Sequence, residues 1–179
     1  MEPGKTQPNK SPEPLARSVP LSRFTSQVGG GSAFFVRRIL PFDAMKTQTQ
    51  NFESLDKIAL RALCDRLLTD DSDAVEECIA FIEAETLGVW HGRARAMMAR
   101  RLKHCRLSQP QRTRVVRAIL YRLVSGRFSE QFNDQLRFIL HVAPEKAFTV
   151  ARSCQGVAAE HVRRYATWIL SHETHDRCA

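Results

Sequence analysis

Acidic side chains are missing from residues 86–129, a stretch of 44 residues that contains no Asp or Glu. The same stretch has eleven Arg or Lys side chains, whereas residues 51–85 have ten acids and only three bases. The formal net charge of +8 is therefore not a uniform excess of base, because an acidic segment directly precedes a strongly basic one. This pattern excludes neither a phosphate-binding surface nor two segments whose charges compensate each other.

Long apolar runs are also missing. The longest uninterrupted apolar stretches span a few residues, far fewer than the roughly 20 that a membrane-spanning helix needs. The first 30 residues contain no apolar core of the kind found in secretory signals. The five cysteines are odd in number and far apart, which is typical of free thiols in a reducing compartment. The sequence therefore predicts a cytoplasmic protein that makes no membrane contact and has no disulfides.

Proline is scarce after residue 50, since six of the eight prolines lie in residues 1–50 together with the Gly29-Gly30-Gly31 run. This composition offers little apolar periodicity to offset the entropy of an unfolded chain. We therefore predict that residues 1–50 are a disordered leader. Met45 stands just before the first periodic segment, and we hypothesise that it is the true translational start.

Strand-like alternation is absent from residues 51–172, where apolar residues recur at three- and four-residue spacing. This periodicity predicts a domain of about seven helices, followed by a frayed tail at residues 173–179. We expect the helices over residues 54–68, 73–86, 90–104, 109–125, 130–141, 144–155 and 157–171. The start signal is strongest at Ser108, where Pro110 and Gln111 complete a capping box. Ser129 is expected to cap the fifth helix, and Gly88 and Gly126 are expected at or just past helix ends.

The predicted helix starts repeat at a fixed interval. Those near Ser72, Ser108 and Pro144 are 36 residues apart each time, and short loops make neighbouring helices antiparallel. We therefore predict an all-α fold of antiparallel helix pairs, stacked as a short HEAT-like α-solenoid. Signature residues of HEAT, tetratricopeptide and ankyrin repeats are not found, so the likeness is one of period alone. A closed helical bundle is the alternative.

The basic stretch supplies the candidate binding surface. Its members share an outward side of the third or the fourth predicted helix: Arg93, Arg100, His104, Arg114, Arg117 and Tyr121. Clustered arginines can neutralise phosphates, and a tyrosine among them can stack on a base. The alternative interpretation is a solvated face whose charge balances the acidic segment.

Arg101 differs from these residues because it falls within the apolar arc of the third predicted helix. An arginine in that position normally pairs with a carboxylate, and the acidic segment offers Glu76, Glu77, Glu83 and Glu85. We therefore predict a structural ion pair between Arg101 and one of these glutamates. The second and third predicted helices should then pack side by side.

Motifs that support catalysis are missing, including a phosphate-cradling glycine loop and a Gly-x-Ser-x-Gly sequence. His172, His175 and Cys178 could bind zinc together with His161, but the second ligand pair that makes zinc motifs specific is missing. We predict no catalytic residue, no cofactor and no metal site. The sequence favours a non-enzymatic helical-repeat module that binds a protein partner. The alternative is a nucleic-acid backbone binder that uses the basic helix pair of residues 86–129.

Overall fold

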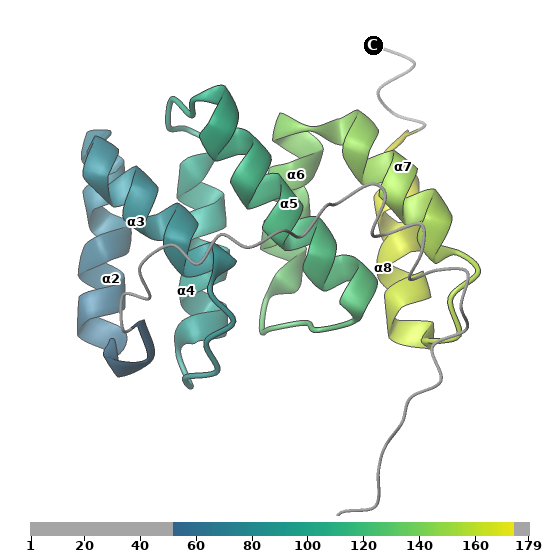
Figure 1. Cartoon of the computed structure of the whole chain (residues 1–179), viewed down its shortest axis with the longest axis horizontal. Coiled ribbons are helices and arrows are strands. Elements are labelled where there is room, and N and C mark those ends of the chain that lie inside the picture. Colours follow the sequence, from purple (N-terminus) through teal and green to yellow (C-terminus); the bar gives the residue numbers. More distant parts are fainter. Residues whose placement is uncertain (1–51, 174–179) are drawn as a thin grey trace, which may run out of the picture.

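The computed structural model describes residues 52–173, which form seven α-helices and no strand (Figure 1). The helices are α2 (Lys57–Arg66), α3 (Ser72–Glu83), α4 (His91–Leu102), α5 (Gln109–Ser125), α6 (Phe132–Val142), α7 (Pro144–Cys154) and α8 (Glu160–Leu170). Two short 3-10 helices, η1 (Phe52–Ser54) and η2 (Leu67–Thr69), flank α2. The predicted all-α class is confirmed for this part of the chain.

Alternate helices along the chain are neighbours in space (Figure 1). α4 lies beside α2 and α6, while α5 lies beside α3 and α7, and α8 packs on α7. Helices that are consecutive in the sequence also touch, as in the pairs α2–α3, α3–α4, α5–α6 and α6–α7. These contacts are compatible with either a solenoid or a helical bundle.

Three helix starts follow the signals in the sequence. α3 begins at Ser72 after Asp71, whose side chain accepts hydrogen bonds from two backbone N–H groups of the first turn. α5 begins after Ser108, which forms the predicted capping box with Gln111, and α7 begins at Pro144. Each signal fixes the local backbone at a helix start, so these starts could be predicted without knowledge of the packing.

Other predicted boundaries were wrong. α3 ends at Glu83, well before Gly88, because Ala84 already has an extended backbone with φ −67° and ψ 136°. The residue that precedes α6 is Gln131, not Ser129, and it has the left-handed φ of 57°. Gly126 does take the left-handed conformation expected after α5, with φ 69°. A non-glycine residue at positive φ is uncommon, so nothing in the local sequence pointed to Gln131.

The core is one continuous set of buried side chains to which all seven helices contribute. Phe81 is fully buried, and its ring meets the edges of the Phe52 and His91 rings at centroid distances of 5.3 Å each. These contacts join η1, α3 and α4. Burial of such apolar surface stabilises the fold by roughly 25 cal/mol per Å².

Three free thiols lie in this core, those of Cys64, Cys78 and Cys154. Burial raises the pKa of Cys64 from its ordinary 9.0 to about 11 and raises that of Cys78 further. At about pH 8, Cys64 should therefore contain roughly a hundredfold less reactive thiolate than an unperturbed cysteine. We expect iodoacetamide to label Cys64 and Cys78 far more slowly than the half-buried Cys105, as measured by peptide mass spectrometry. The three should react alike in urea, and equal native rates would contradict the burial.

In the part of the chain that the structure describes, no helix combines the length and apolar character required to cross a membrane. Several predictions concern residues outside this range. They are the disordered leader, the start at Met45, and almost all of the frayed tail, including His175 and Cys178 of the zinc-like spacing.

Candidate functional site

Two residues of the predicted basic surface, Arg93 and Arg100, connect α4 to the α5–α6 loop and to α6, respectively. The Arg93 guanidinium donates two hydrogen bonds to the Glu130 carboxylate, 2.7 Å from Nε and 3.2 Å from Nη2. Arg100 Nη1 lies 3.0 Å from Asp134 Oδ2. His104 is exposed beyond the end of α4. Both arginines therefore stabilise a helix interface, although each stays about half exposed.

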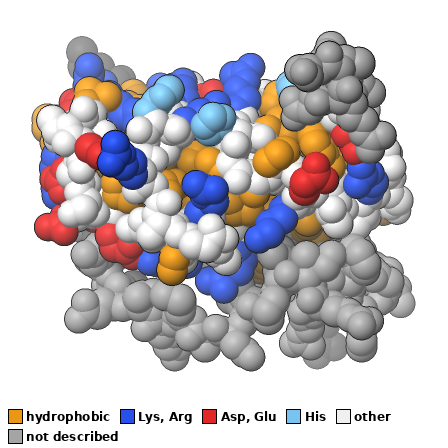
Figure 2. All heavy atoms as spheres, turned by 90° about the horizontal axis from the view of Figure 1, so that it is seen from above, with side chains coloured by type: hydrophobic (Ala, Val, Ile, Leu, Met, Phe, Trp, Pro, Cys, Tyr) orange, Lys and Arg blue, Asp and Glu red, His pale blue; other side chains and the backbone are white. Residues whose placement is uncertain are grey.

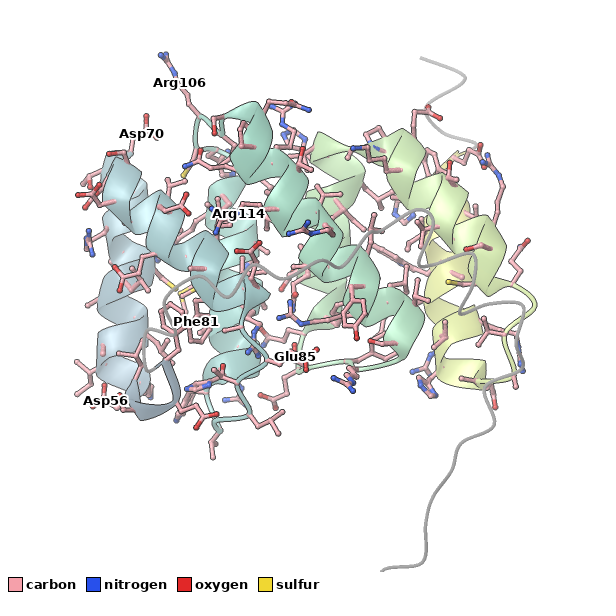
Figure 3. All side chains as sticks on the ribbon, viewed as in Figure 1. Asp56, Asp70, Phe81, Glu85, Arg106 and Arg114 are labelled. Atoms are coloured by element: carbon pink, nitrogen blue, oxygen red, sulfur yellow. The ribbon has the colours of Figure 1, made fainter. Side chains whose placement is uncertain are left out.

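Arg114 connects α5 to α3 (Figure 3). Its Nε lies 3.2 Å from both carboxylate oxygens of Glu83, its Nη2 lies 2.6 Å from Oε2, and its Nη1 pairs with Glu76. The hydrogen bonds that Arg114 donates to Glu83 and Glu76 hold the pKa of Arg114 well above its ordinary range. Arg117 lies farther from Glu83, at 3.9 Å, and Tyr121 is half-buried on the same helix.

The predicted surface residues are thus divided between two interfaces, α4–α6 and α3–α5. Six arginines of the basic stretch form ion pairs with acids of residues 52–173: Arg93, Arg100, Arg101, Arg114, Arg117 and Arg127. Arg106 differs, since it projects away from the helices (Figure 3). The acidic segment supplies the partners of four of them, Arg101, Arg114, Arg117 and Arg127. Arg93 and Arg100 pair instead with acids that follow the basic stretch, Glu130 and Asp134.

Arg101 forms an ion pair with an aspartate of α2, not with a glutamate of α3. Its Nη1 lies 2.7 Å from Asp65 Oδ1. α4 does pack against α3, but α2 lies beside the part of α4 that contains Arg101. The glutamates have other partners, because Glu77 pairs with Arg66 and Glu83 pairs with Arg114. The predicted partner was therefore wrong.

Two other arginines line a hollow of about 560 Å³ at the opposite end of α4 from Arg106. We call it the arginine hollow, and define it by residues 85–89, Gly92, Arg95, Arg122 and residues 127–130. Its walls come from the α3–α4 loop, the first turns of α4, the end of α5 and the α5–α6 loop. Figure 3 labels Glu85, one of the residues that line the hollow, below Arg114 and on the opposite side of the molecule from Arg106.

Arg95 is held in this wall by the end of α3 and the loop that follows it. Only 4% of its surface is exposed. Its Nη2 donates to the Ala84 carbonyl at 2.8 Å, to the Thr86 carbonyl at 2.8 Å and to Thr86 Oγ1 at 2.7 Å. Its guanidinium also lies over the Phe81 ring, 5.2 Å from the centroid. Its Nε is buried and has no hydrogen-bond partner among the described residues.

Arg122 reaches the same helix end from α5. It is 6% exposed, and its Nη2 donates to the carbonyls of Ile82 and Ala84. Its Nη1 is buried and, within residues 52–173, has no hydrogen-bond partner. The last carbonyls of a helix have a partial negative charge, so both arginines stabilise the end of α3. This structural role leaves at least one buried nitrogen of each guanidinium without an acceptor among residues 52–173.

The hollow therefore contains two buried positive charges, those of Arg95 and Arg122. Two carboxylates also line it, but each is in an ion pair, Glu85 with Arg127 and Glu130 with Arg93. Burial lowers the pKa of Arg95 and of Arg122 to about 10, and the charge of Arg122 contributes to the shift at Arg95. Both remain protonated at neutral pH. No carboxylate of residues 52–173 forms an ion pair with either, because Glu83 is paired with Arg114 and Glu85 with Arg127.

The α3–α4 loop places two apolar side chains beside the hollow. Leu87 is 96% exposed and Val89 is 88% exposed. The loop backbone is fixed, because the Gly88 N–H donates to His91 Nδ1 at 3.2 Å and His91 is buried. A Cβ at Gly88 would lie 2.5 Å from the His91 ring, so this contact requires glycine.

A second hollow, of about 250 Å³, lies where α5 begins and α6 meets α7. Figure 2 shows this upper face, where hydrophobic side chains are visible between Lys and Arg side chains. The cations that line it, Arg112 and Lys146, are exposed. Of these two hollows, the arginine hollow has the larger volume and is the one lined by buried cations, so it is the stronger candidate.

Residues 52–173 contain no group of three or more His, Cys, Asp or Glu side chains placed to hold a metal ion. No protein-family model, no curated protein and no solved structure matches the chain. The arginine hollow is therefore the feature of the described residues from which a function can be inferred.

Proposed function

We propose that this protein is a non-enzymatic helical module that binds an acidic segment of a protein partner at the arginine hollow. One observation supports this most directly: two exposed apolar side chains, Leu87 and Val89, flank two buried guanidinium groups that lack carboxylate partners. Apolar anchors next to desolvated arginines are typical of the residues that dominate protein interfaces. The fixed loop also favours binding, because little loop entropy is lost when a partner docks.

The helix order supports a short HEAT-like solenoid as the scaffold for this function. In such a stack, the loops between helix pairs gather along one edge, where they form a continuous binding surface. The α3–α4 and α5–α6 loops both contribute to the arginine hollow, as neighbouring repeats would. A protein partner could contact both loops at once.

Nucleic-acid binding is the weaker candidate. Contacts from Arg93, Arg100, Arg114 and Arg117 to phosphates would compete with ion pairs that already join the helices. Each phosphate contact would then have to compensate for the loss of an internal pair. An acidic peptide at the arginine hollow needs none of these four residues as a contact, and of their partners only Glu130, which is paired with Arg93, lines the hollow.

The test measures fluorescence anisotropy of labelled pools of short peptides that have Glu next to Leu at the centre and mixed residues elsewhere. We expect the Glu pool to bind wild-type protein at least about tenfold more tightly than a matched Gln pool. Replacement of both Leu87 and Val89 by Ser should weaken binding at least about tenfold, since the apolar anchors are lost. The matched control replaces Ile58 and Leu68, two exposed apolar residues outside the hollow, by Ser. This variant should bind the Glu pool as tightly as wild-type protein does.

Two results would overturn the proposal. One is the absence of binding by the Glu pool. The other is tighter binding of a labelled single-stranded oligonucleotide, with a slope of log affinity against log salt of roughly −3 to −4 for four phosphate contacts.

A further inference from the structure

We infer that the arginine hollow receives a phosphate monoester, namely a phosphorylated side chain in the partner segment. This inference rests on the proposed function and names the chemical group that the site recognises. Three properties of the hollow favour such a group: its charge, its hydrogen-bond donors without acceptors, and its size.

The charge of the hollow matches a dianion. The guanidiniums of Arg95 and Arg122 are buried without a carboxylate partner, and a buried charge is costly unless it is paired. The end of α3 offsets only part of this charge, since a helix terminus is equivalent to about half of one elementary charge. A phosphate monoester has a charge of about −1.5 to −2 at neutral pH, whereas a carboxylate has −1. The monoester therefore balances the remaining charge more completely.

The donors are already in position. Arg95 and Arg122 each use Nη2 to bind carbonyls of residues 82–86, so both guanidiniums are fixed before a ligand arrives. Arg95 Nε and Arg122 Nη1 are buried and have no acceptor within residues 52–173, so each would gain a hydrogen bond from a ligand oxygen that reaches it. A phosphate group has three strong acceptor oxygens, enough to accept from both arginines. Such preorganisation is typical of arginine clusters that bind phosphorylated motifs.

The dimensions favour a phosphorylated peptide over an isolated phosphate ion. A volume of about 560 Å³ accommodates the modified side chain together with parts of its neighbours. Leu87 and Val89 would contact an apolar neighbour in the peptide. The first turn of α4 contributes Gly92 to the wall and adds the positive end of a helix dipole. An internal nucleic-acid phosphate is a diester of single charge and balances the two arginines less well.

The experiment compares three labelled peptide pools whose fixed central residue, next to Leu, is phosphoserine, Glu or Ser. We expect the phosphoserine pool to bind wild-type protein at least about tenfold more tightly than the Glu pool at equal ionic strength. The advantage should shrink as the pH falls below about 6, where the phosphate takes up its second proton. Anisotropy titrations at neutral and mildly acidic pH measure both effects.

Matched variants locate the binding. Leu87→Glu puts a negative charge on the rim and should weaken phosphoserine binding at least about tenfold. Leu68→Glu makes the same change at an exposed leucine outside the hollow and should leave binding unchanged. Arg122→Gln tests the pocket directly, but it also removes a stabilising contact to α3. A phosphopeptide titration of wild-type protein, followed by NMR, therefore accompanies it and should shift the Arg95 Nε–H resonance.

The outcomes separate the two proposals. Equal affinity for the phosphoserine and Glu pools would overturn the phosphate inference and leave the proposed function in place. Binding of no pool would overturn both. Binding of inorganic phosphate without any phosphopeptide, or tighter binding of a 5′-phosphorylated oligonucleotide, would overturn the assignment to a protein partner.

Discussion

Phe81→Ala is expected to lower the free energy of unfolding by about 3–5 kcal/mol, the range for loss of a fully buried aromatic ring. The ring is 0% exposed and fills the space between η1, α3 and α4, with edge contacts to Phe52 and His91. Removal would leave a cavity that helices anchored by other core contacts cannot close. Urea unfolding followed by far-UV circular dichroism measures the loss.

Leu87→Ala is the control, because Leu87 is 96% exposed and should change the free energy by less than about 0.5 kcal/mol. A loss at Phe81 below about 1 kcal/mol would be inconsistent with its place at the junction of η1, α3 and α4.

Arg114→Met should lower the free energy of unfolding by about 2–4 kcal/mol, a value between those for exposed and for buried ion pairs. Arg114 is 16% exposed and lies between Glu76 and Glu83, so its removal leaves two carboxylates without their shared cation. Arg127→Met is the matched control, because Arg127 and its partner Glu85 are both more than half exposed. That variant should cost less than about 1 kcal/mol. Equal losses would show that the α3–α5 network has no special role.

The pH dependence gives this experiment a second readout. The hydrogen bond from Arg114 lowers the pKa of Glu76 below its ordinary value of 4.5. A lowered carboxyl pKa in the folded state contributes stability that is fully present above the ordinary value and is lost as the pH falls through the folded value. The difference in melting temperature between wild-type protein and Arg114→Met should therefore become smaller below about pH 4. Thermal melts at several pH values measure this difference.

The helices could be predicted because their signals are local. The capping box at Ser108, the proline at position 144 and the three- and four-residue apolar spacing each act within one or two turns. The end of α3 could not be predicted in this way, since no glycine or proline marks Ala84. The partner of Arg101 depended on which helix lies beside α4, and a helical wheel does not contain that information.

The arginine hollow was missed for a related reason. Arg95 and Arg122 belong to the basic stretch, but the predicted binding surface contained only arginines on the outward faces of the helices. Arg122 lies three residues after Ile119, on the buried stripe of α5, and this position was a usable signal. Its hydrogen bonds reach carbonyls 38 and 40 residues away, which only the tertiary structure brings into range. The charge pattern predicted the compensation between helices but not the two cations without carboxylate partners.

The spacing of the interhelical ion pairs has a consequence for folding during synthesis. The pairs of Arg93, Arg100, Arg114 and Arg127 join residues 31 to 42 positions apart. Loop-closure entropy changes slowly with length, so the cost of forming each pair is nearly the same. Each ion pair can form once the 31 to 42 residues that follow its first member have been synthesised. The domain can therefore assemble stepwise as it leaves the ribosome.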